Sequence, residues 1–263
     1  MNSYINKPTN KPALFLCETC DFNPYNSKEA LVPTELESKC SFFPQSYSNC
    51  SLSSLIDYSN PNHVEYLSQR RSGIRNIRFL VNVLHYTPTV LYKAISYMDK
   101  IYLQSSMPVS CIDNVSTLCL LLSVQFNDCC EQIPLGDLFT LVRLIPKYNE
   151  LEIQCLIALD YDLSIDTPYD YINNAFQAGV FYDKSNVNFL YSQSIQSMNE
   201  FIDDDRALDF SPYVLAMTII KSVCEKNSQF SIEQFEYVKD INFKNVRFFQ
   251  CNFVINCIYS SRN

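Results

Sequence analysis

The chain of 263 residues is 47% hydrophobic and has a net charge of −8. This composition excludes a wholly disordered chain and argues against a broad nucleic-acid-binding face, because such faces need clustered lysine and arginine. Doubly wound sheets, barrels and phosphate-binding loops need glycine for tight turns, and the chain has only 3 glycines. We therefore expect an all-α protein of one large or two ordinary domains.

The 12 cysteines first suggest disulfides or zinc. However, the sequence has neither a segment of signal-peptide type nor an apolar run long enough to span a bilayer, so we expect a soluble protein with reduced thiols, in the nucleus, the cytoplasm or both. Cys17 and Cys20 form a lone CxxC without a second pair at zinc-ribbon spacing. We predict no metal site and no cofactor. Six other cysteines lie in apolar helical patterns as small hydrophobes: Cys111, Cys119, Cys155, Cys224, Cys251 and Cys257.

The N-terminal residues 1–62 are rich in Asn, Ser and Pro and have no sustained periodicity. This composition predicts a largely disordered extension. From His63 the pattern changes: residues 63–67 predict a short helix, and a longer helix follows. Its apolar residues recur at helical spacing and are Ile74, Ile77, Val81 and Leu84.

Four more helices complete a first group that ends near residue 166. Thr87 and Pro88 mark the start of the second helix, which has an apolar stripe. The third helix, at 115–126, is apolar on all sides and is therefore expected to be buried by the others. The fourth and fifth helices are predicted at 137–144 and 149–159.

A second group of five helices is predicted after Pro168, which marks a break. Its third helix, at 212–224, is again strongly apolar. The other predicted helices of this group lie around 169–176, 191–202, 232–238 and 246–257. The chain thus reads as two consecutive five-helix groups, preceded by a short N-terminal helix and the extension.

Several short stretches resemble the cyclin family in order and spacing. In the first group these are SYMDKIY at 96–102, STLCLLLSVQFND at 116–128 and YNELEIQCLIALDYDLSI at 148–165. In the second group they are DFSPYVLA at 209–216 and the closing helix at 246–260. The resemblance implies an N-terminal cyclin box at 63–166 and a C-terminal cyclin fold at 167–263.

The resemblance implies a regulatory subunit, not an enzyme, that binds and activates a cyclin-dependent protein kinase in cell-cycle and cell-division control or in transcription control. In the family a lysine that ends the third helix and a glutamate in the fifth anchor the kinase. Here Glu152 keeps the glutamate, whereas the lysine position is Gln125, an uncharged and weaker anchor. The apolar residues that complete the implied interface around this pair are Leu122, Phe126, Leu156, Tyr161 and Leu163. For Leu122 and Leu163, burial in the core is an equally good explanation.

The resemblance also implies a structural ion pair between Arg75 and Asp99, with Arg78 as the competing partner. Many cyclins have a substrate-docking groove on the first helix. The corresponding positions here are Ile74, Ile77, Arg78 and Val81. These residues predict that the groove is absent or altered.

Two other classes of protein remain open. Because Gln125 replaces the lysine of the family, a degenerate cyclin-fold scaffold that binds a protein other than a kinase is one alternative. A cyclin fold of the general-transcription-factor type is disfavoured by the acidic charge. An enzyme is the least expected class, because His63 and His85 are the only histidines and neither lies in a catalytic grouping. We expect no nucleic-acid or membrane partner, and a monomer outside the kinase heterodimer.

Overall fold

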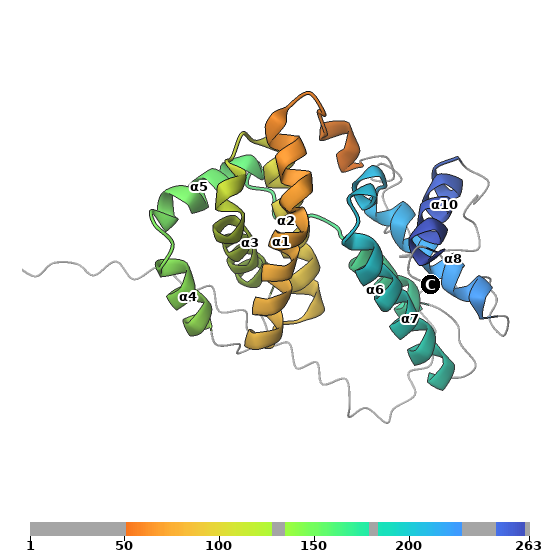
Figure 1. The fold of residues 1–263 in the computed structure, drawn as a ribbon. Helices are drawn as coiled ribbons and strands as arrows, with labels where there is room; N and C mark the ends of the chain where they lie inside the picture. Colours follow the sequence, from red (N-terminus) through yellow and green to blue (C-terminus); the bar gives the residue numbers. More distant parts are fainter. Residues whose placement is uncertain (1–50, 128–134, 179–183, 228–245, 261–263) are drawn as a thin grey trace, which may run out of the picture.

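The computed structural model describes residues 51–127, 135–178, 184–227 and 246–260 (Figure 1). Within these ranges all regular secondary structure is helical, which confirms the predicted all-α class. Cys17 and Cys20, the predicted helix at 232–238 and most of the predicted extension lie outside the described residues.

The first long helix, α1, runs without a break from Pro61 to Leu84. The prediction of a separate short helix at 63–67 is therefore wrong. Asn60 caps α1 by accepting a hydrogen bond from the backbone N–H of Asn62, and Pro61 occupies the first turn, where its missing N–H costs nothing. His85 ends the helix in the left-handed conformation. The short turn η2, Leu52–Leu55, precedes α1.

The first group of helices is built around α3, Ile112–Asn127, in which 10 of 16 residues are buried. As predicted, α3 is the core helix, and it contacts α1, α2 (Pro88–Gln104), α4 (Leu135–Arg143) and α5 (Tyr148–Ala158). The stretch Val109–Asn127 is long and apolar enough to cross a bilayer by length and composition alone. Its burial among four helices accounts for that composition.

The second group is built around α8, Pro212–Lys226. This helix packs against α6 (Pro168–Ala178), α7 (Lys184–Ile202) and α10 (Val246–Ser260), and the turn η4, Asp205–Asp209, leads into it. The apolar third helix of this group is thus confirmed as its core. The number of five helices in this group stays a prediction, as do the domain boundaries at residues 62 and 166.

A buried ion pair joins α1 to α2, but its arginine is not the one predicted. Arg70 donates from Nε to Oδ1 of Asp99 at 2.7 Å and from Nη2 to Oδ2 at 2.9 Å, and the Tyr66 hydroxyl donates to Oδ1 at 2.5 Å. Burial lowers the pKa of Arg70, but the adjacent Asp99 carboxylate more than offsets this and leaves it raised. Arg70 therefore keeps its charge in the core, where it is paired with Asp99.

The predicted partner Arg75 is exposed, and its Nε donates to the backbone oxygen of Arg71. At 100° per residue, Arg75 lies about 140° around α1 from Arg70, away from the face that packs on α2. The competing candidate, Arg78, instead binds Asp203 at 2.7 Å. The assignment of Arg75 to the pair is therefore wrong, whereas Asp99 is confirmed as its acidic member.

The same face of α1 fastens the first group of helices to the second. Arg70 Nη1 donates to the backbone oxygen of Ile202 at 2.7 Å, and Arg78 Nη2 donates to that of Asn199 at 3.1 Å. The Tyr92 hydroxyl of α2 donates to the Asn199 side chain at 2.9 Å. The end of α7 is thus held by side chains of α1 and α2.

Gly73 allows α1 and α2 to approach closely. A Cβ at this position would lie 2.4 Å from Sδ of Met98 and 3.1 Å from a side-chain carbon of Ile112, both of which are buried. We expect Gly73→Ala to lower the free energy of unfolding by about 1–2 kcal/mol, because overpacking outweighs the better helix propensity of alanine. Urea unfolding measures this change.

Gly136 in α4 provides the matched control, because a Cβ there meets no atom within 4 Å. Gly136→Ala should leave stability unchanged or raise it by up to about 1 kcal/mol. Equal effects of the two substitutions would contradict close packing at Gly73.

Candidate functional site

Large apolar side chains are exposed on the last three helices of the first group and just after them. Among the described residues, six large hydrophobic side chains at the end of α3, on or just after α4 and on or just after α5 expose 39–76% of their surface. We call them the α3–α5 surface, and they are Phe126, Leu141, Leu144, Ile153, Ile157 and Tyr161. In Figure 1, α4 and α5 lie at the edge of the molecule farthest from the second group. Exposed apolar surface of this kind is typical of protein interfaces.

The residues predicted to bind a kinase lie on helices that contact each other, since α3 packs against α5. Phe126 and Gln125 are exposed at the end of α3, and Glu152 and Leu156 are half-buried one turn apart on α5. Their roles in binding stay predictions. Leu122 is buried in the core, and Leu163 is half-buried against it. For Leu122 the structure thus favours the packing role that the sequence left open.

Tyr161, the most exposed of the predicted apolar interface residues, is held in an unusual turn. The Tyr161 N–H donates to the Leu156 carbonyl, and the Asp160 N–H donates to that of Ile157, both at 2.9 Å. These two bonds form a Schellman motif that closes α5. Asp160 and Tyr161 both have φ of 55°, a left-handed conformation that costs an L-residue about 1–2 kcal/mol. The turn therefore contains strain next to an exposed aromatic side chain.

Side chains of α2 fix the chain that follows this turn. Lys100 Nζ donates to the carbonyl of Leu159 at 3.3 Å, and the Tyr97 hydroxyl donates to that of Leu163 at 2.6 Å. Burial raises the pKa of Tyr97 to about 12, so its hydroxyl stays a donor at neutral pH. Lys93 donates to the Ile165 carbonyl further on. The exit from α5 is thus anchored on both sides of Tyr161.

The sequence analysis missed four members of the α3–α5 surface: Leu141, Leu144, Ile153 and Ile157. One signal for two of them was present. The fifth helix carries large apolar residues beyond its core strip of Cys155 and Leu159, which are fully buried. A helix with apolar residues outside the strip that meets the core either is buried on all sides or offers a second face to a partner. Ile153 and Ile157, one turn apart, form that second face.

Comparison with known proteins found no matching family model and no match among curated proteins. Among solved structures, the chain is similar to a viral cyclin from herpesvirus saimiri, with a TM-score of 0.56 and 14% identity over 81% of this chain and 96% of that chain. It is also similar to a chain of the yeast RNA polymerase II CTD kinase complex CTDK-1, with a TM-score of 0.55 and 15% identity over 83% and 72% of the two chains.

Both matches extend over both groups of helices, and together with the all-helical architecture they decide the fold. The chain has a cyclin fold. At 14–15% identity the likeness carries the fold alone. Within this cyclin fold, α3 is the buried helix that the resemblance placed at 116–128.

The positions assigned to a substrate-docking groove are buried or bound by another side chain. Ile74, Ile77 and Val81 are buried in the core, and Arg78 is engaged by Asp203. The exposed apolar residues of α1 are Val64, Phe79 and Val83, on other faces of the helix. These four side chains therefore offer no exposed apolar surface, and an absent or altered groove stays a prediction.

The described part of the chain contains no group of three or more His, Cys, Asp or Glu side chains placed to hold a metal ion. The six described cysteines are free thiols. Burial raises the pKa of Cys155 to about 12, so this thiol is protonated and unreactive at neutral pH.

The strain after α5 makes a prediction of its own. We expect Asp160→Gly to raise the free energy of unfolding by up to about 1 kcal/mol, because glycine adopts the left-handed conformation without steric cost. For a chain of this size, this corresponds to a rise of about 2–4 °C in melting temperature. Asp160→Val is the matched test in the opposite direction. It should lower the melting temperature, since β-branched residues tolerate this conformation poorly, and a rise with valine would contradict the backbone conformation.

Proposed function

We propose that the chain is a cyclin, a regulatory subunit that binds and activates a cyclin-dependent protein kinase through the α3–α5 surface. The single observation that carries this proposal is the set of exposed apolar residues on the first helical group of a cyclin fold. One structural neighbour is a viral cyclin, and another belongs to a kinase complex. We further propose that it acts in cell-cycle or transcription control, in the nucleus, the cytoplasm or both.

The mechanism rests on helix packing. A protein kinase is active only when a lysine on one of its strands pairs with a glutamate on its mobile helix. A partner that buries one face of that mobile helix shifts the population toward the paired state, provided that it binds this state more tightly. The α3–α5 surface offers apolar side chains for this burial, with the half-buried Glu152 and the exposed Gln125 as polar anchors beside them.

Affinity purification with the full chain tests the partner, and two substitutions test the anchors. We expect one protein kinase to co-purify. Glu152→Ala should weaken its binding by about tenfold to a hundredfold, a usual loss when a polar anchor at an interface is truncated. Gln125→Lys should strengthen binding, because a charged donor forms the stronger hydrogen bond. Equal affinity of the wild type and Glu152→Ala would show that the interface lies elsewhere.

A second candidate is a cyclin-fold scaffold that binds a protein other than a kinase. The uncharged Gln125, where cyclins have lysine, favours this alternative. It predicts a stable partner that still requires the α3–α5 surface but has no kinase domain. Identification of the co-purified protein separates the two candidates.

A further inference from the structure

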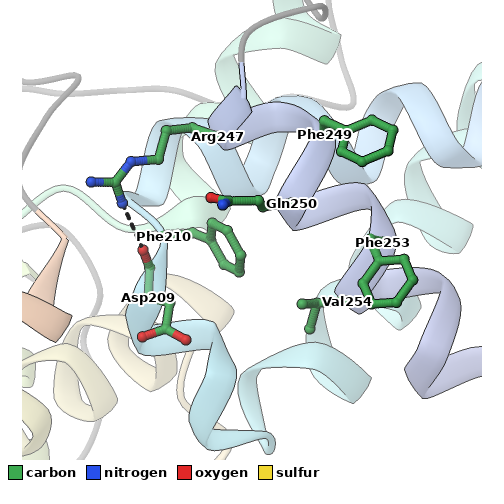
Figure 2. A pocket seen from close by; sticks show the side chains of 7 residues that line it. All are labelled: Asp209, Phe210, Arg247, Phe249, Gln250, Phe253 and Val254. Atoms are coloured by element: carbon green, nitrogen blue, oxygen red, sulfur yellow. Dashed lines mark hydrogen bonds between the residues drawn. The ribbon is translucent and has the colours of Figure 1, made fainter.

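A second exposed apolar surface lies on the C-terminal half, at the other end of the molecule. On α10, Val246, Phe249 and Phe253 follow one another at helical spacing, and each exposes 64–70% of its surface. Beside them is a hollow of about 460 Å³ between α10 and the chain that leads into α8 (Figure 2). It is lined by Asp209, Phe210, Arg247, Phe249, Gln250, Phe253 and Val254.

The chemistry of this pocket suits aromatic side chains. Phe210 and Phe253 face the hollow from its two sides, with Val254 between them (Figure 2). Aromatic rings pack against one another in stacked or edge-on arrangements, which add about 0.5–1.5 kcal/mol beyond the burial of area. At the polar edge of the pocket, Arg247 already donates a hydrogen bond to the Asp209 backbone oxygen. An uncharged, aromatic segment therefore fits better than a charged one.

The described part of the chain begins against the turn that ends at this pocket. The turn η2, Leu52–Leu55, packs against η4, and η4 ends at Asp209, which is one wall of the pocket. The described chain that follows residues 1–50 thus starts at η2, beside the turn that ends at the pocket. A segment tethered this closely has an effective concentration of about millimolar, so a weak intrinsic affinity is enough to fill the site.

We propose that the pocket is the docking site for the chain's own residues 41–47, with Phe42 and Phe43 as the side chains that enter it. These two phenylalanines are followed by Pro44, and residues 41–50 carry no charge. Phe43 lies eight positions before Ser51, and a fully extended chain over those eight steps spans at most about 26–29 Å. Proline also favours an extended conformation at Phe43, which lowers the entropy cost of docking. This surface is separate from the α3–α5 surface, so the proposal goes beyond the proposed function.

Photo-crosslinking in the purified full chain tests this assignment. With benzoylphenylalanine in place of Phe253, we expect an adduct within one chain that mass spectrometry maps to residues 41–47. Its yield should fall at least tenfold in Phe42→Ser/Phe43→Ser. The matched control Leu14→Ser/Phe15→Ser removes a similarly apolar pair nearer the N-terminus and should leave the yield unchanged. The same probe at Phe189, an exposed residue of α7, should give no such adduct.

Three outcomes would overturn the proposal. An adduct between two chains would show that a second copy fills the pocket. An adduct at any other segment of the same chain, or no adduct at all, would exclude residues 41–47. Hydrogen exchange provides an independent measurement: the amides of residues 249–254 should exchange severalfold faster in Phe42→Ser/Phe43→Ser than in the wild type. Because only the purified chain is used, failure here leaves the kinase proposal untouched.

Discussion

Replacement of Arg70 by methionine is expected to lower the free energy of unfolding by about 3–5 kcal/mol, the largest loss that we predict for a single substitution. The Arg70 side chain is 1% exposed and its Asp99 partner 5%. Removal of one member of a buried ion pair leaves the other charge in the core without compensation. The Tyr66 hydroxyl, which donates to the same carboxylate, cannot neutralise it. Urea unfolding, followed by circular dichroism, measures the change.

Arg78→Met is the matched control for this experiment. Arg78 also pairs with an aspartate, Asp203, but the two side chains are 26% and 31% exposed. Partly exposed pairs contribute at most about 1 kcal/mol, so this variant should be only slightly destabilised. The double variant Arg70→Met/Asp99→Leu should recover much of the loss, because apolar pairs often replace buried ion pairs without cost. If Arg70→Met and Arg78→Met were equally stable, the buried pair would not be the link between α1 and α2.

The second large effect concerns partner binding. Ile153→Asp combined with Ile157→Asp should weaken binding to the co-purified kinase by more than about a hundredfold. The two side chains lie one turn apart on α5 and are 53% and 56% exposed, so the free protein tolerates the charges. In a complex the carboxylates would be buried without a partner, at a cost of several kcal/mol. Titration calorimetry measures the loss of affinity.

A matched pair on α1 controls for the added charge. Phe79 and Val83 have the same spacing and similar exposure, 63% and 54%, but lie outside the α3–α5 surface. Phe79→Asp/Val83→Asp should bind the kinase as the wild type does. Equal loss in both double variants would indicate a nonspecific effect of charge, and loss only in the α1 variant would place the interface on α1.

Helical periodicity was enough to predict the all-α class and the core helix of each group. The reason is visible in α3: a helix that is apolar on every side has to be surrounded by other helices, whatever their order. The same reasoning failed at 63–67, because local pattern does not show whether a helix continues through Gly73. Whether α1 continues through Gly73 depends on its packing against α2, which lies far away in the sequence.

Side-chain pairing and exposure were harder to predict. Four arginines lie between residues 70 and 78, and only the rotation of α1 against α2 selects Arg70 for Asp99. The left-handed turn at Asp160 and Tyr161 has no glycine that would have indicated it. Ile153 and Ile157 have the composition of core residues, and only the arrangement of α3 and α5 shows that they face outward.

Kinase activation is tested most directly by the activity of the co-purified kinase, measured alone and with increasing amounts of this chain. The measured quantity is the rate of phosphate transfer to a peptide substrate. We predict a rise of at least a hundredfold that saturates at one chain per kinase, and no rise with Ile153→Asp/Ile157→Asp. A kinase that binds the chain tightly but keeps its basal rate would contradict the account and favour a scaffold.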